Sequence, residues 1–196
     1  CFNRPRFWGA ADLTPLKQAA FGLNPLFHRA IMVASVGRRS KRAAPQMNGG
    51  FFMLKGISPI ISPELLKIIA EMGHGDELVL ADANFPGTSI GQKCVRCDGH
   101  GCAEVMRALL TLFPLDDFVE APLAVMQVPA GMFPGDKAPI WEAFRAAADT
   151  DLPTAKFDMM AHDAFMERAK KAFAVVQTGE TALYGNIIIR KGVVRA

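Results

Sequence analysis

A histidine enclosed by glycines is the first feature of this sequence that could do chemistry. His74 lies between Gly73 and Gly75, and Asp82 follows at the end of an apolar run. The glycines have no Cβ, so a ligand can approach the backbone closely on both sides. A carboxylate can fix the tautomer of a histidine, whose ordinary pKa of about 6.5 suits proton transfer near neutral pH. We interpret His74 as a candidate acid–base catalyst with Asp82 as its partner; the alternative is a structural histidine.

A cysteine-rich segment is a second candidate site. The pattern C-x-x-C-x-G-x-G begins at Cys94 and Cys97, and His100 and Cys102 lie close behind. The pattern resembles the repeat of the cysteine-rich zinc modules of chaperones, which assemble each four-ligand zinc site from two copies. This chain has one copy, and further ligands from His100 and Cys102 would crowd one tight loop. We therefore expect ordinary cysteines and no bound metal, with a zinc-binding module as the alternative.

Other catalytic patterns give little support for cofactor or nucleotide chemistry. The sequence has no G-x-G-x-x-G that follows a strand and opens a helix, no P-loop, no H-E-x-x-H and no G-x-S-x-G. We expect an enzyme without a cofactor. His162 precedes a predicted helix, where it could face a cleft or simply be a neighbour of the helix start.

The elements that must position these residues alternate between helices and strands. Ser62 and Pro63 are typical of a helix start, and the apolar residues that follow are spaced by three and four. We predict helices over 63–72, 103–112, 140–148 and 163–171, strands over 77–81, 93–96, 123–128, 157–160, 173–177 and 186–190, and loops over 84–91 and 129–139. This alternation predicts one α/β domain, a sheet flanked by helices, with Asp82 at the strand end where such sheets bind ligands.

Charge divides the chain into two parts. Residues 1–52 hold eight Lys or Arg and one Asp, whereas residues 53–196 hold fourteen Lys or Arg and eighteen Asp or Glu. The mildly acidic second part disfavours nucleic acid as a partner, and no apolar run reaches the length of about 20 residues that spans a membrane. We interpret residues 1–52 as a basic, proline-containing extension that is disordered or not native, with a targeting segment as the alternative. The four cysteines favour a reducing, cytoplasmic location.

A family resemblance covers essentially all of residues 53–196 and none of residues 1–52. The segments that carry it are MLKGISP at 53–59, SPELL at 62–66, AEMGHGDE at 70–77, DANFP at 82–86, R-x-D-G at 96–99, ERA at 167–169, KAFA at 171–174, TGE at 178–180 and YGNII at 184–188. In these segments the chain resembles the D-ribose pyranase/L-fucose mutarotase family. The resemblance implies a ribose pyranase-like fold and an isomerase that interconverts the α and β anomers of a free monosaccharide.

The resemblance also implies roles for individual residues. His74 matches the proton donor of the family, and Asp82 matches a substrate-binding carboxylate. Tyr184, Gly185 and Asn186 match a substrate-binding Tyr-(Gly/Ala)-Asn. Members of the family form rings, commonly homodecamers, with active sites built across subunit contacts, so self-association is expected here too.

Two departures from the family pattern concern the choice of sugar. His162 falls at a substrate-binding position where fucose mutarotases have arginine and ribose pyranases have histidine, and Met166 replaces an aromatic residue. Hydrogen bonds in a pocket select a sugar by the hydroxyls that they satisfy. The remaining motifs favour L-fucose; the alternatives are a ribose pyranase-like activity on another sugar, or a sugar-binding protein with weak catalysis.

Overall fold

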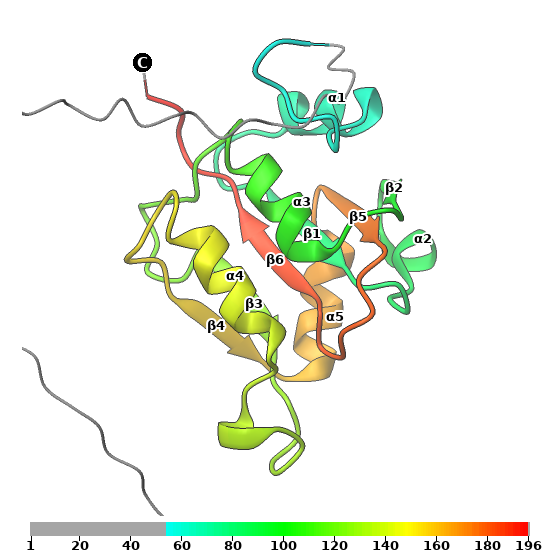
Figure 1. The fold of residues 1–196 in the computed structure, drawn as a ribbon, viewed down its shortest axis with the longest axis vertical. Helices are drawn as coiled ribbons and strands as arrows, with labels where there is room; N and C mark the ends of the chain where they lie inside the picture. Colours follow the sequence, from blue (N-terminus) through cyan, green and yellow to red (C-terminus); the bar gives the residue numbers. More distant parts are fainter. Residues whose placement is uncertain (1–53, 196) are drawn as a thin grey trace, which may run out of the picture. The chain divides into compact units, whose positions relative to one another are not determined.

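The computed structural model describes residues 54–195, and the predicted extension over residues 1–52 lies outside the described range. The elements follow the chain in this order: α1 (Pro63–Glu71), β1 (Glu77–Ala81), α2 (Gly87–Ile90), β2 (Cys94–Cys97), α3 (Cys102–Leu109), β3 (Leu123–Met126), a 3₁₀ turn (Pro134–Asp136), α4 (Ile140–Ala148), β4 (Phe157–Met160), α5 (His162–Lys171), β5 (Ala174–Thr178) and β6 (Ile187–Arg190). The structure confirms the predicted α/β class (Figure 1).

One antiparallel strand runs through an otherwise parallel sheet. The strand order is β2-β5-β1-β6-β3-β4. The pairs β1–β5, β2–β5 and β3–β4 are parallel, whereas β6 pairs antiparallel with both β1 and β3. The carboxyl ends of five strands therefore share one edge of the sheet with the amino end of β6.

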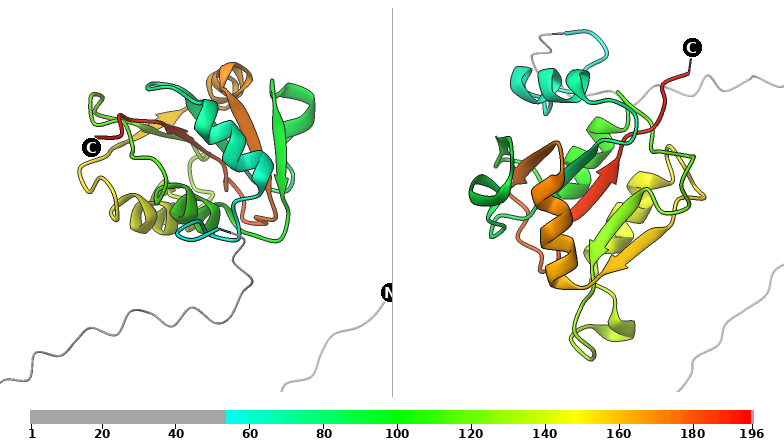
Figure 2. Two further views of the ribbon diagram at one scale, coloured as in Figure 1. Left: turned by 90° about the horizontal axis from the view of Figure 1, so that it is seen from above. Right: turned by 180° about the vertical axis from the view of Figure 1, so that it is seen from behind.

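Helices cover both faces of the sheet, because alternate strand residues point to opposite faces. On one face, Leu78 and Leu80 of β1 pack in a core with the apolar sides of α1, α3 and α4. On the other face, Val79 and Ala81 pack in a second core with Phe165 of α5. Figure 2 shows these layers from two further directions. Since both faces are covered, β1, β3, β5 and β6 are almost entirely buried, as their continuous apolar runs indicate.

Most predicted elements occur at or close to their expected positions. The Ser62 hydroxyl accepts a hydrogen bond from the Leu65 N–H at 3.1 Å, so the predicted helix cap is present. Strand β1, helix α4 and strand β4 have their predicted bounds, and α3 ends three residues early at Leu109. The predicted loop over 84–91 is wrong in part, because Gly87–Ile90 forms the single helical turn α2.

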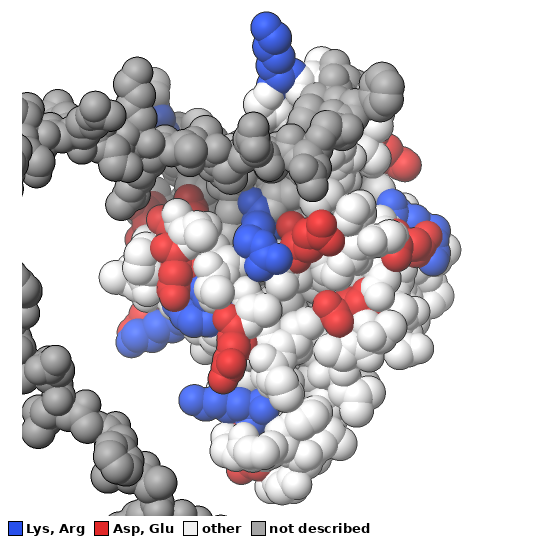
Figure 3. Space-filling model, in the orientation of Figure 1, with Lys and Arg blue, Asp and Glu red and all other residues white. Residues whose placement is uncertain are grey.

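The surface shows no dominant charge on the face that Figure 3 presents. Among the described residues of that face, acidic and basic side chains are interspersed. No helix within residues 54–195 has the length and hydrophobicity needed to cross a membrane.

The cysteines of the C-x-x-C pattern point to opposite faces of the sheet. Cys94 and Cys97 bound strand β2 and are three residues apart, an odd spacing that separates their side chains. The Cys97 thiol faces the carbonyl of Ile60 at 3.8 Å, whereas the Cys94 sulfur accepts from the Thr88 hydroxyl at 3.7 Å. Two thiols on opposite faces cannot bind one zinc ion, so this geometry argues against the zinc module.

We expect alkylation to distinguish these cysteines. Burial raises the pKa of the Cys102 thiol to about 12, which at pH 8 leaves about one molecule in 10⁴ as the reactive thiolate. Cys94 is only partly buried. Brief treatment of the native protein with iodoacetamide should modify Cys94 and spare Cys102, as measured by peptide mapping. Both should react in denaturant, and equal native rates would contradict the burial of Cys102.

The buried face of β1 should account for much of the stability. Leu80 is fully buried, whereas Leu54 is 53% exposed. We expect Leu80→Ala to lower the free energy of unfolding by about 2–5 kcal/mol, because it leaves a cavity in the core. The matched substitution Leu54→Ala should change it by less than about 0.5 kcal/mol. Urea denaturation of both variants measures the difference, and similar losses would contradict this placement of the core.

Candidate functional site

Two groups of polar residues lie at opposite ends of strand β1. We call Asp82, Tyr184, Gly185 and Asn186 the carboxyl-end cluster, because Asp82 follows β1 and the other three precede the antiparallel β6. We call His74 and Asp116 the amino-end dyad, because His74 precedes β1. Between the two groups, β1 from Glu77 to Ala81 alone spans about 13 Å at a rise of about 3.3 Å per residue.

A reciprocal pair of hydrogen bonds holds the carboxyl-end cluster together. The Asn186 amide oxygen accepts from the Asp82 N–H, and the Asn186 amide NH₂ donates to the Asp82 carboxylate, both at 2.8 Å. The N–H of Asn84 donates to the other carboxylate oxygen at 2.9 Å, and the Gln177 amide donates to the Asp82 carbonyl. Asp82 and Asn186 are 8% and 5% exposed. A fixed carboxylate of this kind retains lone pairs for sugar hydroxyls.

The turn before β6 has a backbone that few residues adopt. Tyr184 has φ of 57°, which is uncommon for a residue with a side chain. A Cβ at Gly185 would come within 2.8 Å of the Ala182 carbonyl oxygen and of the Glu180 side chain. The Glu180 carboxylate in turn accepts from the N–H groups of Thr181 and Ala182. Strained turns of this kind cluster at functional sites. Here the turn brings Gly185 close to Asp82, while the Tyr184 ring lies edge-on to Phe133.

His162 lies on the same edge of the sheet but not in the cluster. It is the first residue of α5, directly after the edge strand β4, and its ring is 2.8 Å from the Asp163 carboxylate. Its side chain is 66% exposed. Met166, one turn further along α5, packs with Tyr184 against the second core.

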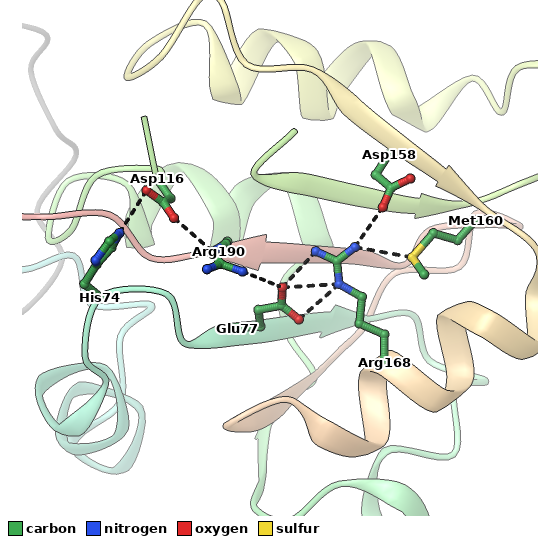
Figure 4. A network of polar contacts seen from close by, with 7 residues as sticks. All are labelled: His74, Glu77, Asp116, Asp158, Met160, Arg168 and Arg190. Atoms are coloured by element: carbon green, nitrogen blue, oxygen red, sulfur yellow. Dashed lines mark hydrogen bonds and ion pairs between the residues drawn. The ribbon is translucent and has the colours of Figure 1, made fainter. Parts of the chain in front are cut away.

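The amino-end dyad pairs an accessible imidazole with a buried carboxylate (Figure 4). His74 Nε2 lies 3.0 Å from Asp116 Oδ1, and the two side chains are 45% and 1% exposed. Asp116 also accepts from the Phe118 N–H at 3.1 Å and from Arg190 Nε at 2.9 Å. The Phe118 ring, with its centroid 5.3 Å from that of His74, covers one side of the imidazole.

These contacts determine the charge of Asp116 and the tautomer of His74. Burial by itself raises the pKa of the Asp116 carboxyl, but the hydrogen bonds from His74, the Phe118 N–H and Arg190 outweigh it and hold the pKa below its ordinary value. Asp116 is therefore ionised at neutral pH and can only accept, so Nε2 of His74 carries a hydrogen. Nδ1 is left as the atom that can exchange a proton.

The sequence-based assignment of a partner to His74 is wrong within one copy of the chain. Asp82 is on the far side of β1 and bonds to Asn186, whereas Asp116 bonds to His74. Sequence reasoning missed Asp116 because it is 42 residues from His74 in a loop without a motif. The signal that was available is a pair of carboxylates, Asp116 and Asp117, between the apolar residues Leu115 and Phe118.

The glycines on either side of His74 belong to a turn that is fixed by hydrogen bonds of their N–H groups. The Gly73 N–H donates to the Asp76 carboxylate at 2.7 Å, and the Gly75 N–H donates to the Lys191 carbonyl at 2.9 Å. Gly75 has φ of 86°, a conformation that favours glycine. These bonds tie the turn to the end of β6 and so place His74 beside Asp116. Within residues 54–195, no three His, Cys, Asp or Glu side chains are grouped to hold a metal ion.

Several known proteins are similar to this chain in sequence or in structure. A fucose mutarotase of Danio rerio is 50% identical over 151 residues, which cover 72% of this chain and 95% of that protein. An L-fucose mutarotase of Actinobacillus pleuropneumoniae is 54% identical over 144 residues, which cover 72% of this chain and 97% of that protein. The crystal structure of the fucose mutarotase of Streptococcus pneumoniae in complex with L-fucose matches with a TM-score of 0.66 and 46% identity, covering 72% of this chain and 100% of that one.

A family model identifies the same part of the chain. The model described as the RbsD / FucU transport protein family matches residues 55–194, which hold both the carboxyl-end cluster and the amino-end dyad. Because the family model matches residues 55–194 and these relatives are 50% and 54% identical in sequence, the chain belongs to the RbsD / FucU family.

Proposed function

We propose that this chain is an L-fucose mutarotase, an isomerase that interconverts the α and β anomers of the free sugar without a cofactor. Relatives that are 50% and 54% identical carry this name, and a structural relative is described in complex with L-fucose. The observation that carries the proposal is the 3.0 Å contact between His74 Nε2 and the buried Asp116 carboxylate. It holds an accessible imidazole in one tautomer, as proton transfer requires.

The chemistry needs one bond to break and form again. As the bond between C1 and the ring oxygen breaks, the ring oxygen gains a proton and the anomeric hydroxyl loses one, which gives the open-chain aldehyde. Rotation about C1–C2 and closure on the other face give the other anomer. We assign delivery of the first proton to Nδ1 of His74 in its imidazolium form, which carries a hydrogen on both ring nitrogens and keeps the hydrogen bond from Nε2 to Asp116. The neutral Nε2–H imidazole that remains takes the proton back at Nδ1 when the ring closes. The proton of the anomeric hydroxyl passes to a basic oxygen of the carboxyl-end cluster and returns at closure, so protons balance over the cycle.

The carboxyl-end cluster is proposed to bind the sugar. Each Asp82 oxygen already accepts one hydrogen bond and can accept another from a sugar hydroxyl. The phenol of Tyr184, the backbone at Gly185 and the amide of Asn186 offer further polar contacts. We add His162 as an outer contact, since it lies on the same edge of the sheet.

The site is proposed to form between two copies of the chain. Because β1 separates the amino-end dyad from the carboxyl-end cluster by more than the length of a pyranose, one copy cannot place both groups on one sugar. A neighbouring copy can supply the missing half, and the exposed Phe118 beside His74 offers apolar surface for that contact. A closed ring in which every interface repeats satisfies this need, and we propose a homodecamer.

His162 favours a second sugar. It occupies a position where the family resemblance associates histidine with ribose pyranases, so D-ribose is the alternative substrate.

The free thiols of Cys94, Cys97 and Cys102 support a reducing, cytoplasmic location.

The role of His74 can be tested by anomer exchange. We expect His74→Ala to lower the exchange of L-fucose anomers above the spontaneous rate by about 10²–10⁴-fold, the usual contribution of a positioned acid–base group. Saturation-transfer NMR on L-fucose and D-ribose measures the rate and identifies the preferred sugar. The matched control is His100→Ala, because His100 contacts only Glu104 among the described polar side chains. Wild-type exchange in His74→Ala would refute the assignment, and binding without exchange in the wild type would select the sugar-binding alternative.

A mixing experiment tests the shared site. His74→Ala and Asp82→Ala should each be inactive alone, since each lacks one half of every site. Co-expressed, they should recover activity in about one quarter of the sites, where an intact dyad meets an intact cluster. If Asp82→Ala fails to fold, Tyr184→Phe replaces it. Mixed oligomers that assemble, as measured by light scattering, and stay inactive would contradict a site shared between copies.

A further inference from the structure

The amino-end dyad forms one end of a network of side chains whose charges alternate in sign (Figure 4). Arg190, the final residue of β6, donates from Nε to Asp116 Oδ2 at 2.9 Å, while His74 contacts Oδ1. On its other side, Arg190 Nη1 is 3.9 Å from the Glu77 carboxylate. Arg190 therefore lies between two carboxylates and is closer to the one that holds His74.

A second arginine binds the Glu77 carboxylate. Arg168 of α5 reaches both Glu77 oxygens, with Nη2 to Oε1 at 2.8 Å and Nε to Oε2 at 3.1 Å. Arg168 Nη1 also donates to Asp158 at 2.9 Å. The Glu77 and Arg168 side chains are 16% and 22% exposed, so solvent screens this pair less than a surface pair. The hydrogen bonds with Glu77 raise the pKa of Arg168 above its ordinary value.

We propose that Arg190 is a positioning residue for proton transfer by His74, and that Arg168 keeps it there by binding the competing carboxylate of Glu77. This inference rests on the proposed mutarotase function. Arg190 fixes the rotation of the Asp116 carboxylate by binding Oδ2, which leaves Oδ1 facing Nε2 of His74. It also supplies the positive charge that a nearly fully buried carboxylate needs in order to stay ionised.

The charges of the network explain why both arginines are needed. Three carboxylates, Asp116, Glu77 and Asp158, face two guanidinium groups, those of Arg190 and Arg168. The two arginines and a protonated His74 make the network neutral. If Arg168 were lost, Glu77 would become a free acceptor next to Arg190, and the bond from Arg190 to Asp116 would have a competitor.

The first test removes the charge of Arg190. Arg190→Gln should lower kcat by about 10–100-fold, by analogy with the loss of the groups that orient metal-binding histidines. It should also shift the pH profile of kcat to higher pH, because the loss of a positive charge favours the protonated form of every titrating neighbour. Arg190→Lys keeps the charge and should keep the wild-type profile. The matched control is Arg195→Gln, because Arg195 pairs with the adjacent Asp117 at 2.7 Å and is exposed.

The second test separates Arg168 from Glu77. Arg168→Gln should reduce kcat, because Glu77 then competes with Asp116 for Arg190. The double variant Arg168→Gln/Glu77→Gln removes the competitor and should recover most of the activity. Recovery is not expected if Arg168 only stabilises the fold, so a double variant as slow as the single one would overturn the role of Arg168.

A readout without substrate keeps this inference distinct from the proposed function. Nitrogen-15 NMR of histidine-labelled protein reports which ring nitrogen of His74 carries the hydrogen at high pH. We expect Nε2–H in the wild type and in Arg195→Gln, and a mixture of tautomers in Arg190→Gln. A wild-type tautomer, rate and pH profile in Arg190→Gln would overturn the proposal. A wild type that shifts tautomer as expected but exchanges no sugar would refute only the mutarotase function.

Discussion

The antiparallel pairing of β6 with β1 is the constraint on which both halves of the site depend. In this register Glu77 faces Arg190 at one end of the two strands, and Leu80 faces Ile187 at the other. The pairing therefore brings Asn186, just before β6, to Asp82, just after β1. The same pairing brings Arg190 to the edge where His74 and Asp116 lie. A parallel β6 would have placed Asn186 and Arg190 at the wrong edges.

The two carboxylates at these ends are held in different ways, and the difference suits different tasks. Asp82 is bound by neutral donors, the amide of Asn186 and the N–H of Asn84, which fix its direction without neutralising its charge. Such a carboxylate remains a strong acceptor for hydroxyl groups. Asp116 faces an imidazole and a guanidinium, which compensate its burial. Its charge is used within the protein to orient His74, so it is not available to a ligand.

Local patterns in the sequence sufficed to predict most of the elements but not the contacts between them. The apolar runs of β1 and β3 and the Ser-Pro start of α1 give their positions because each depends on neighbours within a few residues. The turn α2 was missed because it has no side-chain cap and only four residues. Asp116 was missed for another reason: its partners His74 and Arg190 are 42 and 74 residues away, and the antiparallel course of β6 that gathers them leaves no periodic signal.

In the proposed function, the division of the site between two edges of the sheet also links activity to assembly. The parallel strands place the carboxyl-end cluster where α/β sheets commonly bind ligands, whereas His74, which the family resemblance matches to a proton donor, lies at the opposite edge. Under the proposed function, His74 at the far edge acts on a sugar that a second copy binds. Isolated copies should therefore bind the sugar weakly and exchange its anomers at the spontaneous rate in water, although both the dyad and the cluster are present in each folded copy. The proposed coupling gives the pair of Arg190 and the buried Asp116 a second consequence, because a rigid dyad can be presented to a neighbouring copy without reordering.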